Sequence, residues 1–348
     1  MAKVDVVVPC YNYGRYLVDC VRSVLDQSIK DVRVLVIDDA SSDDSLEVAK
    51  RLSALDWRVE VVTHGRNLGH IATYNEGIER ADSDYFLLLS ADDMLVPGAL
   101  ERAIEVLAKN PDVVLTYGEC VSWHDELPIP RIEPTQRYTW SRHDLLKEIC
   151  TTGTNVVPTP TAIARTSVQK AIGGYRALLP HAGDMEMWLR FAANGSVARI
   201  KAVQAIYRKH PNAMSNAYFA EAMSDYSQRQ LAFDSFFEEY EHRLSSSHRL
   251  SGVARGALAD HVFRCGITLL RQGRPKDGVR LIQEAMRIDR RLRYLPPVWQ
   301  LFKLPSAEGR QRALSAVRVG VSHMLGRRRG ALSGSQRKRG GGSGEEAT

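Results

Sequence analysis

Two apolar segments of this sequence each lead into a pair of aspartates. The pairs are Asp38 with Asp39, after residues 32–37, and Asp92 with Asp93, shortly after residues 85–89. Runs this apolar are typical of strands in a parallel sheet covered on both faces, and ligands bind at the carboxyl ends of such strands. Carboxylates gathered there repel one another unless a cation or hydrogen-bond donors hold them. The pattern therefore predicts a site for a phosphate-rich ligand and a hard metal ion.

The elements that position these aspartates alternate between strand and helix over residues 4–117. The expected strands are 4–8, 32–38, 58–63, 85–89 and 113–117. The segments between these strands show the apolar periodicity of helices, and one of these helices is expected at 70–81. Ser41 and Asp44 resemble a capping box at the start of another. This order predicts an α/β fold with a mostly parallel sheet and helices on both faces.

The second half of the sequence changes character. We expect surface loops at 123–136 and 153–160, a strand at 161–164, a helix at 184–194 and an extended stretch ending at Tyr207. After residue 216 the pattern is helical, at about 216–243, 251–272, 276–289 and 307–325, and the Gly- and Ser-rich end is expected to be disordered. The predicted domains are therefore 1–215, with halves 1–117 and 118–215, a helical region 216–325 and a basic tail 326–348.

The composition is that of an ordinary globular protein. Of 348 residues, 44% are hydrophobic and 25% are charged, and no run approaches the ~18 apolar residues of a membrane span. No signal peptide is expected, and five scattered cysteines indicate reduced thiols in a cytosolic protein. The net charge is +6, with much of the excess near the C-terminus. We expect no nucleic-acid partner.

Several motifs occur in one order along the chain, and together they resemble the family 2 glycosyltransferases of the GT-A fold over about residues 3–215. The resemblance implies a Rossmann-like nucleotide-binding half and an inverting transfer from a nucleotide-sugar donor. The motifs are Val6-Val7-Val8-Pro9-Cys10-Tyr11-Asn12, Val36-Ile37-Asp38-Asp39-Ala40-Ser41-Ser42-Asp43, Asn67-Leu68-Gly69 with Asn75 and Gly77, and Ser90-Ala91-Asp92-Asp93.

Transfer from a nucleotide sugar builds negative charge on the departing diphosphate, which a divalent cation can neutralise. Mg²⁺ or Mn²⁺ prefers oxygen ligands, and Asp92 and Asp93 would supply them. Similar proteins often carry another aspartate at the position of Ser90, so Asp92 is the main expected ligand. The segment Arg208-Lys209-His210 resembles the family's Arg-x-His element, in which the histidine can bind the metal or the diphosphate.

The nucleoside base must be recognised as well. Uracil or thymine presents an N3–H donor between two carbonyls, so a carboxylate suits the donor and an aromatic ring suits the base face. Asp38 and Tyr11 match the positions that the resemblance assigns to this task, whereas Asp39 could instead cap the following helix. The full set of nucleotide-binding residues implied is Pro9, Tyr11, Asn12, Asp38, Asp39, Asn67 and Asp92.

The acceptor hydroxyl needs a general base. The segment 181–190 resembles the family's Glu-Asp-x-x-x-Trp-x-Arg region, in which the aspartate matching Asp184 is the base of a one-step inverting displacement. This chain has Gly183 where the family often has Glu. A helix beginning at Asp184 would lower the pKa of its carboxyl group, and Glu186 is the alternative base. Trp188 is expected in the core, and His181 near the acceptor site.

The helical region allows two interpretations. Residues 257–286 resemble a single tetratricopeptide-like helix pair, but a plain helical hairpin is preferred because such repeats need about three copies. An apolar stripe in 307–325 beside Arg327, Arg328 and Arg329 either packs on the protein or binds an anionic membrane surface. The second option would place a cytoplasmic enzyme on the inner face of the membrane.

The leading hypothesis is a UDP- or dTDP-sugar-dependent glycosyltransferase acting on a glycan, lipid-linked or protein acceptor in cell-surface polysaccharide, glycolipid or glycoprotein assembly. One alternative is a nucleotidyltransferase of related fold, although the loop 10–14 lacks the Gly- and Lys/Arg-rich character that holds a triphosphate. Another is a non-catalytic nucleotide-sugar-binding module with a helical tail that recruits partners. A dinucleotide oxidoreductase is not expected, because no Gly-x-Gly-x-x-Gly follows Val8.

Overall fold

The structure is a computed structural model that describes residues 4–133, 137–214, 222–244 and 247–289. The chain divides into two compact units, with the boundary between Ala254 and Arg255. The predicted domain boundary at residue 215 was placed where the sequence stops predicting strands, and it does not coincide with the boundary between the two units. It stays a prediction.

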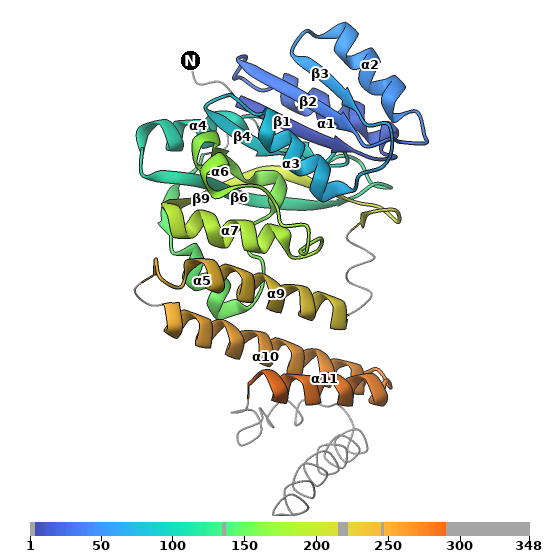
Figure 1. Cartoon of the computed structure of the whole chain (residues 1–348). Helices are drawn as coiled ribbons and strands as arrows, with labels where there is room; N and C mark the ends of the chain where they lie inside the picture. The colour runs from blue at the N-terminus through green and yellow to red at the C-terminus, as the bar shows by residue number, and fades with distance from the viewer. Residues whose placement is uncertain (1–3, 134–136, 215–221, 245–246, 290–348) are drawn as a thin grey trace, which may run out of the picture. The chain divides into compact units, whose positions relative to one another are not determined.

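A nine-stranded sheet forms the centre of the first unit (Figure 1). Its order is β3-β2-β1-β4-β8-β6-β9-β5, and β7 also pairs with β9. The strands β3, β2, β1 and β4 are parallel, whereas β8 runs antiparallel to both β4 and β6. The α/β fold is confirmed, with a parallel first half and a mixed second half. The strands are β1 (Val4–Cys10), β2 (Val32–Asp38), β3 (Val59–Thr63), β4 (Tyr85–Leu88), β5 (Met94–Leu95), β6 (Val113–His124), β7 (Trp140–His143), β8 (Ile163–Arg165) and β9 (Ser196–Lys209).

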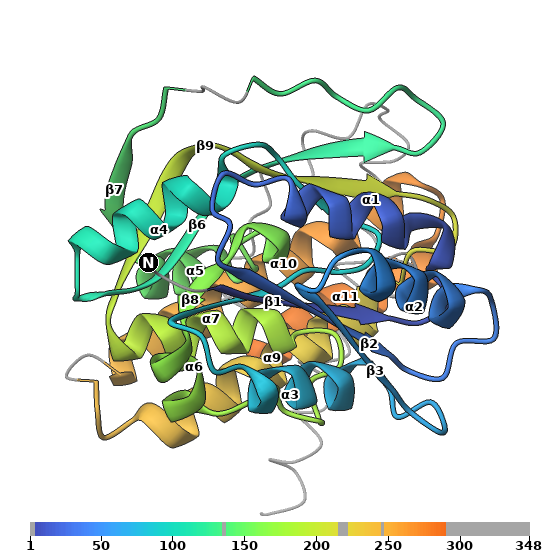
Figure 2. The same cartoon turned by 90° about the horizontal axis from the view of Figure 1, so that it is seen from above.

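Helices cover both faces of the sheet, as predicted. Figure 2 shows α1, α2 and α4 on one face and α3, α6 and α7 on the other. The helices of this unit, with one short 3-10 turn, are α1 (Gly14–Leu25), α2 (Ser45–Leu55), α3 (His70–Arg80), α4 (Ala99–Lys109), α5 (Leu145–Thr152), η1 (Thr159–Thr161), α6 (Thr166–Ile172), α7 (Gly183–Asn194) and α9 (Ala222–Tyr240).

Strand β1 carries apolar side chains on both faces of the sheet, and both faces must therefore be packed against helices. Val6 and Val8 belong to the core that includes Leu17 of α1, and none of these side chains is exposed. Val7 points to the opposite face, because side chains alternate along a strand. There it meets α3 so closely that a Cβ atom on Gly77 would lie 2.3 Å from its Cγ1. Gly77 therefore allows α3 to pack directly on the sheet.

Some local predictions were wrong. Ser41 and Asp44 do not form a capping box: α2 begins at Ser45 without a side-chain cap from Asp44, and Asp43 Oδ1 instead accepts the amide of Ser45 at 3.0 Å. The strand predicted at 113–117 continues to His124, because its second half pairs with β9. The short elements β5, β7, α5 and α6 were not expected.

Long helices follow α9, as the sequence predicts: α10 (Ser247–Arg271) and α11 (Pro275–Ile288). Within the second unit these two approach closely, since a Cβ atom on Gly266 would lie 2.8 Å from the carbonyl oxygen of Gly278. This contact fits a helical hairpin. The helix predicted at 307–325 and the basic tail lie outside the described residues. Among those described, no helix combines the length and the apolar character needed to cross a membrane.

Candidate active site

The carboxyl ends of three parallel strands lie side by side at one edge of the sheet. Strand β1 pairs with β2 so that Cys10 stands beside Asp38, and it pairs with β4 so that Val7 stands beside Leu88. The segments that follow these strands carry the predicted nucleotide and metal residues. The fold therefore brings them to one region, as expected for strands that end at the same edge.

Asp38 has an unfilled hydrogen-bonding position. Its side chain is 1% exposed, and its Oδ2 accepts the amide of Ser41 at 3.3 Å. Its other oxygen, Oδ1, is buried, and no donor from the described residues reaches it. A buried acceptor without a partner is costly, so a donor brought by a ligand would satisfy it.

Asp39 has a different environment, because its carboxylate is fully engaged. It accepts the amides of Leu68 and Gly69 at 2.7 and 2.9 Å, and it pairs with His64 Nδ1 at 2.7 Å. Burial raises the pKa of Asp39, but these hydrogen bonds bring the pKa below its ordinary value. Asp39 thus ties the loop after β2 to the loop before α3, and it makes no cap on α2.

His64 was not expected from the sequence. Its second ring nitrogen lies 2.6 Å from Glu76 Oε2 on α3, so the imidazole stands between two carboxylates. Burial lowers the pKa of His64, but Asp39 and Glu76 together raise it above the usual value. No local sequence motif predicts this bridge, because Asp39, His64 and Glu76 are far apart in the sequence.

The loop after β1 contains the predicted Tyr11 and Asn12. Tyr11 is 46% exposed, which leaves its ring available to a ligand. Asn12 has a φ of 59°, and its Oδ1 accepts the amide of Ser42 at 2.8 Å, so it joins this loop to the one after β2. Pro9 lies within β1, and Asn67 Oδ1 accepts the amide of Gly69 at 3.0 Å.

Asp92 and His210 meet, although they are far apart in the sequence. His210 Nε2 lies 3.1 Å from Asp92 Oδ2, and both side chains are largely buried. The rings of Tyr13 and Tyr16 pack against the imidazole, with centroids 5.5 and 4.7 Å from it. The two tyrosines, which the sequence did not indicate for this role, fix His210 beside Asp92.

Asp93 points into the protein. It is 2% exposed, and its Oδ1 accepts the amide of Arg208 at 3.0 Å. Burial, with a contribution from Asp92, raises the pKa of Asp93 well above its ordinary value. The metal-ligand assignment of Asp93 stays a prediction, and its contacts favour a role in holding the turn after β4.

Arg208 stabilises this turn from β9. Its Nε donates to the carbonyl of Asp92 at 2.9 Å, and its guanidinium pairs with Asp19 and Asp125 at 3.0 and 2.6 Å. The same guanidinium lies 4.5 Å from the ring centroids of Tyr16 and Trp123. Arg208 is therefore a buried, fully paired cation that positions the aspartates.

The residues present fit a divalent ion held jointly with a ligand. Such an ion takes one or two protein ligands and completes its shell with phosphate oxygens and water. Asp92 and His210 can supply the protein's share. Across the described parts of the chain, no group of three or more acidic, histidine or cysteine side chains could hold a metal. The ion would therefore depend on the ligand's phosphates.

Asp184 lies at the start of α7. Thr159 Oγ1 of η1 donates to its Oδ2 at 2.6 Å. Burial raises the pKa of Asp184 above its ordinary value, although Thr159, Tyr175 and the nearby His70 and His181 act to lower it. The net shift is thus opposite in direction to the lowering expected from the helix N-terminus. The element η1 packs against β4 and β5, which flank Asp92, so Asp184 belongs to the same region.

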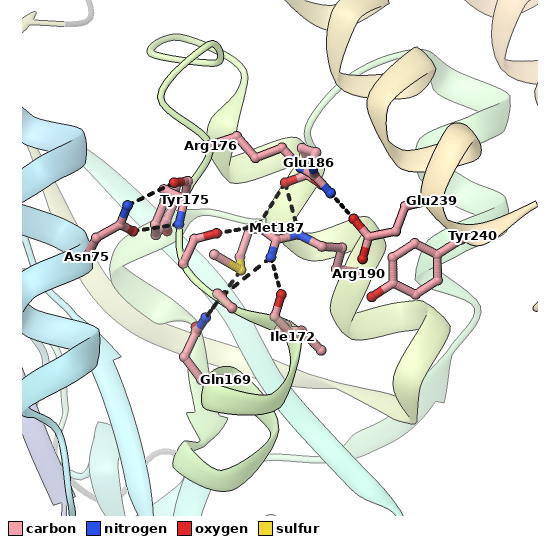
Figure 3. A network of polar contacts seen from close by, with 12 residues as sticks. Asn75, Gln169, Ile172, Tyr175, Arg176, Glu186, Met187, Arg190, Glu239 and Tyr240 are labelled. Carbon is pink, nitrogen blue, oxygen red and sulfur yellow. Dashed lines mark hydrogen bonds and ion pairs between the residues drawn. The ribbon is translucent and has the colours of Figure 1, made fainter.

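Glu186 is not suited to the alternative role of base. It is fully buried, and its oxygens accept from Arg176 Nε at 2.9 Å and from Arg190 Nε at 3.0 Å (Figure 3). Because both oxygens are engaged by guanidinium groups, no face remains for an acceptor. The structure makes Glu186 an internal counter-ion.

This ion pair gives a stability prediction. Glu186→Gln should lower the free energy of unfolding by about 3–5 kcal/mol, because it leaves Arg190 buried without its counter-charge. Urea unfolding measures the change. The matched control is Glu105→Gln, which breaks an exposed pair with Lys109 and should cost less than about 1 kcal/mol. Equal losses in the two variants would contradict this role.

The remaining candidates fall into two groups. Trp188 is buried in the core, as predicted. His70 Nε2 pairs with the carbonyl of Pro180 at 2.9 Å, and His181 Nε2 pairs with Asp225 of α9 at 2.6 Å. The two histidines therefore hold the loop before α7 and lie near Asp184.

Comparisons with known proteins agree with this architecture. The model of the family described as glycosyl transferase family 2 matches residues 5–170. An uncharacterized glycosyltransferase of Haemophilus influenzae is 28% identical over 62% of this chain and 68% of its own length. A putative teichuronic acid biosynthesis glycosyltransferase of Bacillus subtilis is 30% identical over 37% of this chain and 51% of its own.

A similar solved structure is that of S. aureus TarS residues 1–349 in complex with UDP-GlcNAc. Its TM-score is 0.61 at 18% identity, and the alignment covers 93% of this chain and 92% of that one. At this identity the likeness shows the fold alone. It extends beyond the region of the family match and includes the helical part.

Proposed function

Because residues 5–170 of this chain belong to glycosyl transferase family 2, we propose that the protein is an inverting glycosyltransferase using a UDP- or dTDP-linked sugar. The acceptor is a hydroxyl group in cell-surface polysaccharide, glycolipid or glycoprotein assembly. The observation that carries this proposal is the buried oxygen of Asp38 that no donor from the described residues reaches, near the strand ends followed by Asp92 and His210.

The nucleoside would be recognised by Asp38 and Tyr11. The N3–H of uracil or thymine satisfies Asp38 Oδ1, and the exposed ring of Tyr11 stacks on the base. Cytosine has no proton on N3, so it would present an acceptor to a carboxylate. The known complex of the solved neighbour with UDP-GlcNAc supports a uridine-linked donor for this chain.

The diphosphate would lie against Asp92 and His210. Asp92 and His210, which pair with each other and are both largely buried, would be the two protein ligands of Mg²⁺ or Mn²⁺. When bound, the ion neutralises the charge that develops on the departing diphosphate. Arg208 and Asp93 maintain the turn that carries Asp92.

Asp184 would deprotonate the acceptor hydroxyl as it attacks the anomeric carbon. One displacement on the face opposite the diphosphate inverts the configuration of that carbon. The raised pKa of Asp184 favours this role, because a base is most effective when its pKa approaches the working pH. The Thr159 hydroxyl, which donates to Asp184 Oδ2 at 2.6 Å, holds the carboxylate in place.

Thermal stabilisation by nucleotides tests the donor assignment. With Mn²⁺ present, UDP and dTDP should raise the melting temperature most, CDP should raise it least, and a chelator should weaken the effect of each nucleotide. GDP serves as the purine control. Equal shifts for all four nucleotides would contradict the pyrimidine assignment. Binding without sugar transfer to any hydroxyl acceptor would instead favour the non-catalytic alternative.

A further inference from the structure

His64 lies where the loop after β3 meets the loop after β2. Its backbone amide donates to the carbonyl of Asp38 at 2.9 Å. Its ring lies between two carboxylates, with Nδ1 2.7 Å from Asp39 Oδ1 and Nε2 2.6 Å from Glu76 Oε2. The side chain of His64 is only 7% exposed. One residue therefore contacts the backbone of Asp38, the side chain of Asp39 and the helix α3.

The two contacts of the ring constrain its protonation state. An ionised carboxylate accepts hydrogen bonds and donates none, and a neutral imidazole carries a single N–H group. A neutral ring could therefore donate to Asp39 or to Glu76, but not to both. Because each ring nitrogen lies within hydrogen-bonding distance of a carboxylate oxygen, the arrangement requires either an imidazolium or a proton on one of the two carboxyl groups.

The carboxyl groups do not provide this proton, because other donors already engage them. Asp39 accepts two backbone amides, at 2.7 and 2.9 Å, and Glu76 Oε1 accepts from Arg80 Nε at 2.8 Å. Burial raises the pKa of each carboxyl group, but His64 and these donors bring both pKa values below their ordinary range. The proton therefore resides on the ring of His64, which is an imidazolium at neutral pH.

The charged groups around the ring come from two elements. Asp39 faces it from the loop after β2, and Glu76 faces it from α3, where Arg80 pairs with Glu76 in turn. Burial lowers the pKa of His64, but the two carboxylates raise it above the usual value of about 6.5. With the ring charged, two carboxylates and two cations balance. A neutral ring would leave an excess negative charge in a partly buried site, which is unfavourable.

The ring contact adds a link to α3 that the backbone does not supply. The peptide group between Asp38 and Asp39 is already held by the strands on each side, because its carbonyl accepts from His64 and its amide donates to the carbonyl of Cys10 at 2.9 Å. Beyond that peptide, the chain leaves the sheet. There the ring joins the Asp39 side chain to Glu76, and it thereby holds the loops at 39–43 and 64–69, which border the nucleoside site, against α3.

We propose that His64, as an imidazolium shared by Asp39 and Glu76, is the positioning residue of the nucleoside site. It holds the end of β2, where Asp38 is expected to meet the base, in register with α3. This inference rests on the proposed function for the identity of the ligand. Its ionic part, a ring protonated at both nitrogens, can be tested without a ligand.

The affinity for UDP should therefore depend on the charge of His64. The ion triad is complete below the raised pKa of the ring, and it is lost as the pH rises through that pKa, because a neutral ring releases one of its two carboxylates. We expect the dissociation constant of UDP, measured with Mg²⁺, to rise about 5- to 30-fold across this transition, a size common for coupled sites. Calorimetry from about pH 6 to 9 covers the range in which histidine titrates.

Glu76→Gln separates this charge effect from a purely structural one. The substitution keeps the size of a side chain that is 25% exposed, and it removes one of the two negative charges beside the ring, so the pKa of His64 should fall. The loss of UDP affinity should then occur at lower pH than in the wild type. His64→Gln has no ring to titrate, so it should bind UDP weakly at the acid end of the range. Its remaining pH dependence reports the ionisation of UDP itself.

The matched control is His143→Gln. His143 of β7 also pairs with a glutamate through Nε2, but that glutamate is Glu148 of α5, and β7 pairs with β9. This variant should keep the wild-type affinity for UDP and its pH dependence. A ligand-free readout is ¹⁵N NMR of the histidine rings, which distinguishes a ring protonated at both nitrogens from a neutral one. The loss of a signal in His64→Gln assigns His64.

The inference predicts that both ring nitrogens of His64 carry protons at neutral pH. It also predicts that the NMR titration of His64 coincides with the loss of UDP affinity, in the wild type and in Glu76→Gln. A neutral His64 ring at neutral pH would overturn it, and so would equal pH dependence of UDP binding in His64→Gln and the wild type. Should His64→Gln not fold, an unchanged profile in Glu76→Gln would overturn it.

Failure of the wild-type protein to bind UDP at any pH would contradict the proposed function instead. In that case the NMR titration still decides whether the ring of His64 is shared by the two carboxylates. The two failures are therefore distinguishable.

Discussion

Asp184→Asn should reduce sugar transfer by about 10²- to 10⁴-fold and leave the affinity for the donor nucleotide unchanged. The loss corresponds to removal of a general base. The asparagine side chain keeps the shape of the aspartate and can still accept from Thr159, so the site around it should persist. Transfer kinetics and nucleotide binding by calorimetry measure the two quantities separately.

A matched control is Asp112→Asn, which changes an exposed aspartate that pairs with Arg142 at the surface. This variant should transfer sugar at the wild-type rate. Substantial activity in Asp184→Asn would show that the base lies elsewhere. The buried Glu186, engaged by two arginines, offers no ready substitute.

Asp92→Asn should abolish the metal-dependent part of UDP binding and lower transfer by about 10²-fold or more. The carboxylate supplies charge and an oxygen ligand that an amide replaces poorly. We expect the melting temperature of this variant to respond equally to UDP with Mn²⁺ and to UDP with chelator. Wild-type protein should respond more strongly when Mn²⁺ is present.

Asp93→Asn separates the two neighbouring aspartates. Asp93 is buried with a raised pKa and accepts the Arg208 amide, an interaction that an asparagine oxygen can keep. Adding Mn²⁺ together with UDP should therefore raise the melting temperature of Asp93→Asn more than that of Asp92→Asn. If both variants lose the response completely, Asp93 is a ligand as well, and the distinction between them is wrong.

The nucleotide-binding half of the fold could be predicted because its signals are local. Apolar runs such as 32–37, followed directly by aspartates, identify buried parallel strands and their carboxyl ends. Parallel pairing then predicts that Asp38 and Asp92 follow strands ending at the same edge of the sheet, and the pairing of β1 with both β2 and β4 confirms this arrangement. The general region of the site could therefore be predicted from the sequence without knowledge of the tertiary structure.

The supporting contacts could not be predicted, because they join residues distant in the sequence. Nothing near His64 indicates that its ring bridges Asp39 and Glu76, and nothing near Thr159 indicates its hydrogen bond to Asp184. The pKa of Asp184 was misjudged for the same reason. A helix start visible in the sequence lowers it, but the enclosing elements that raise it are known only from the fold.

The direct test of the account is a crystal structure of the protein soaked with Mn²⁺ and UDP. We predict the ion beside Asp92 and His210, with the diphosphate on it and the uracil N3–H within hydrogen-bonding distance of Asp38 Oδ1. An ion and nucleotide bound away from both Asp92 and Asp38 would contradict the proposal that these strand ends form the donor site.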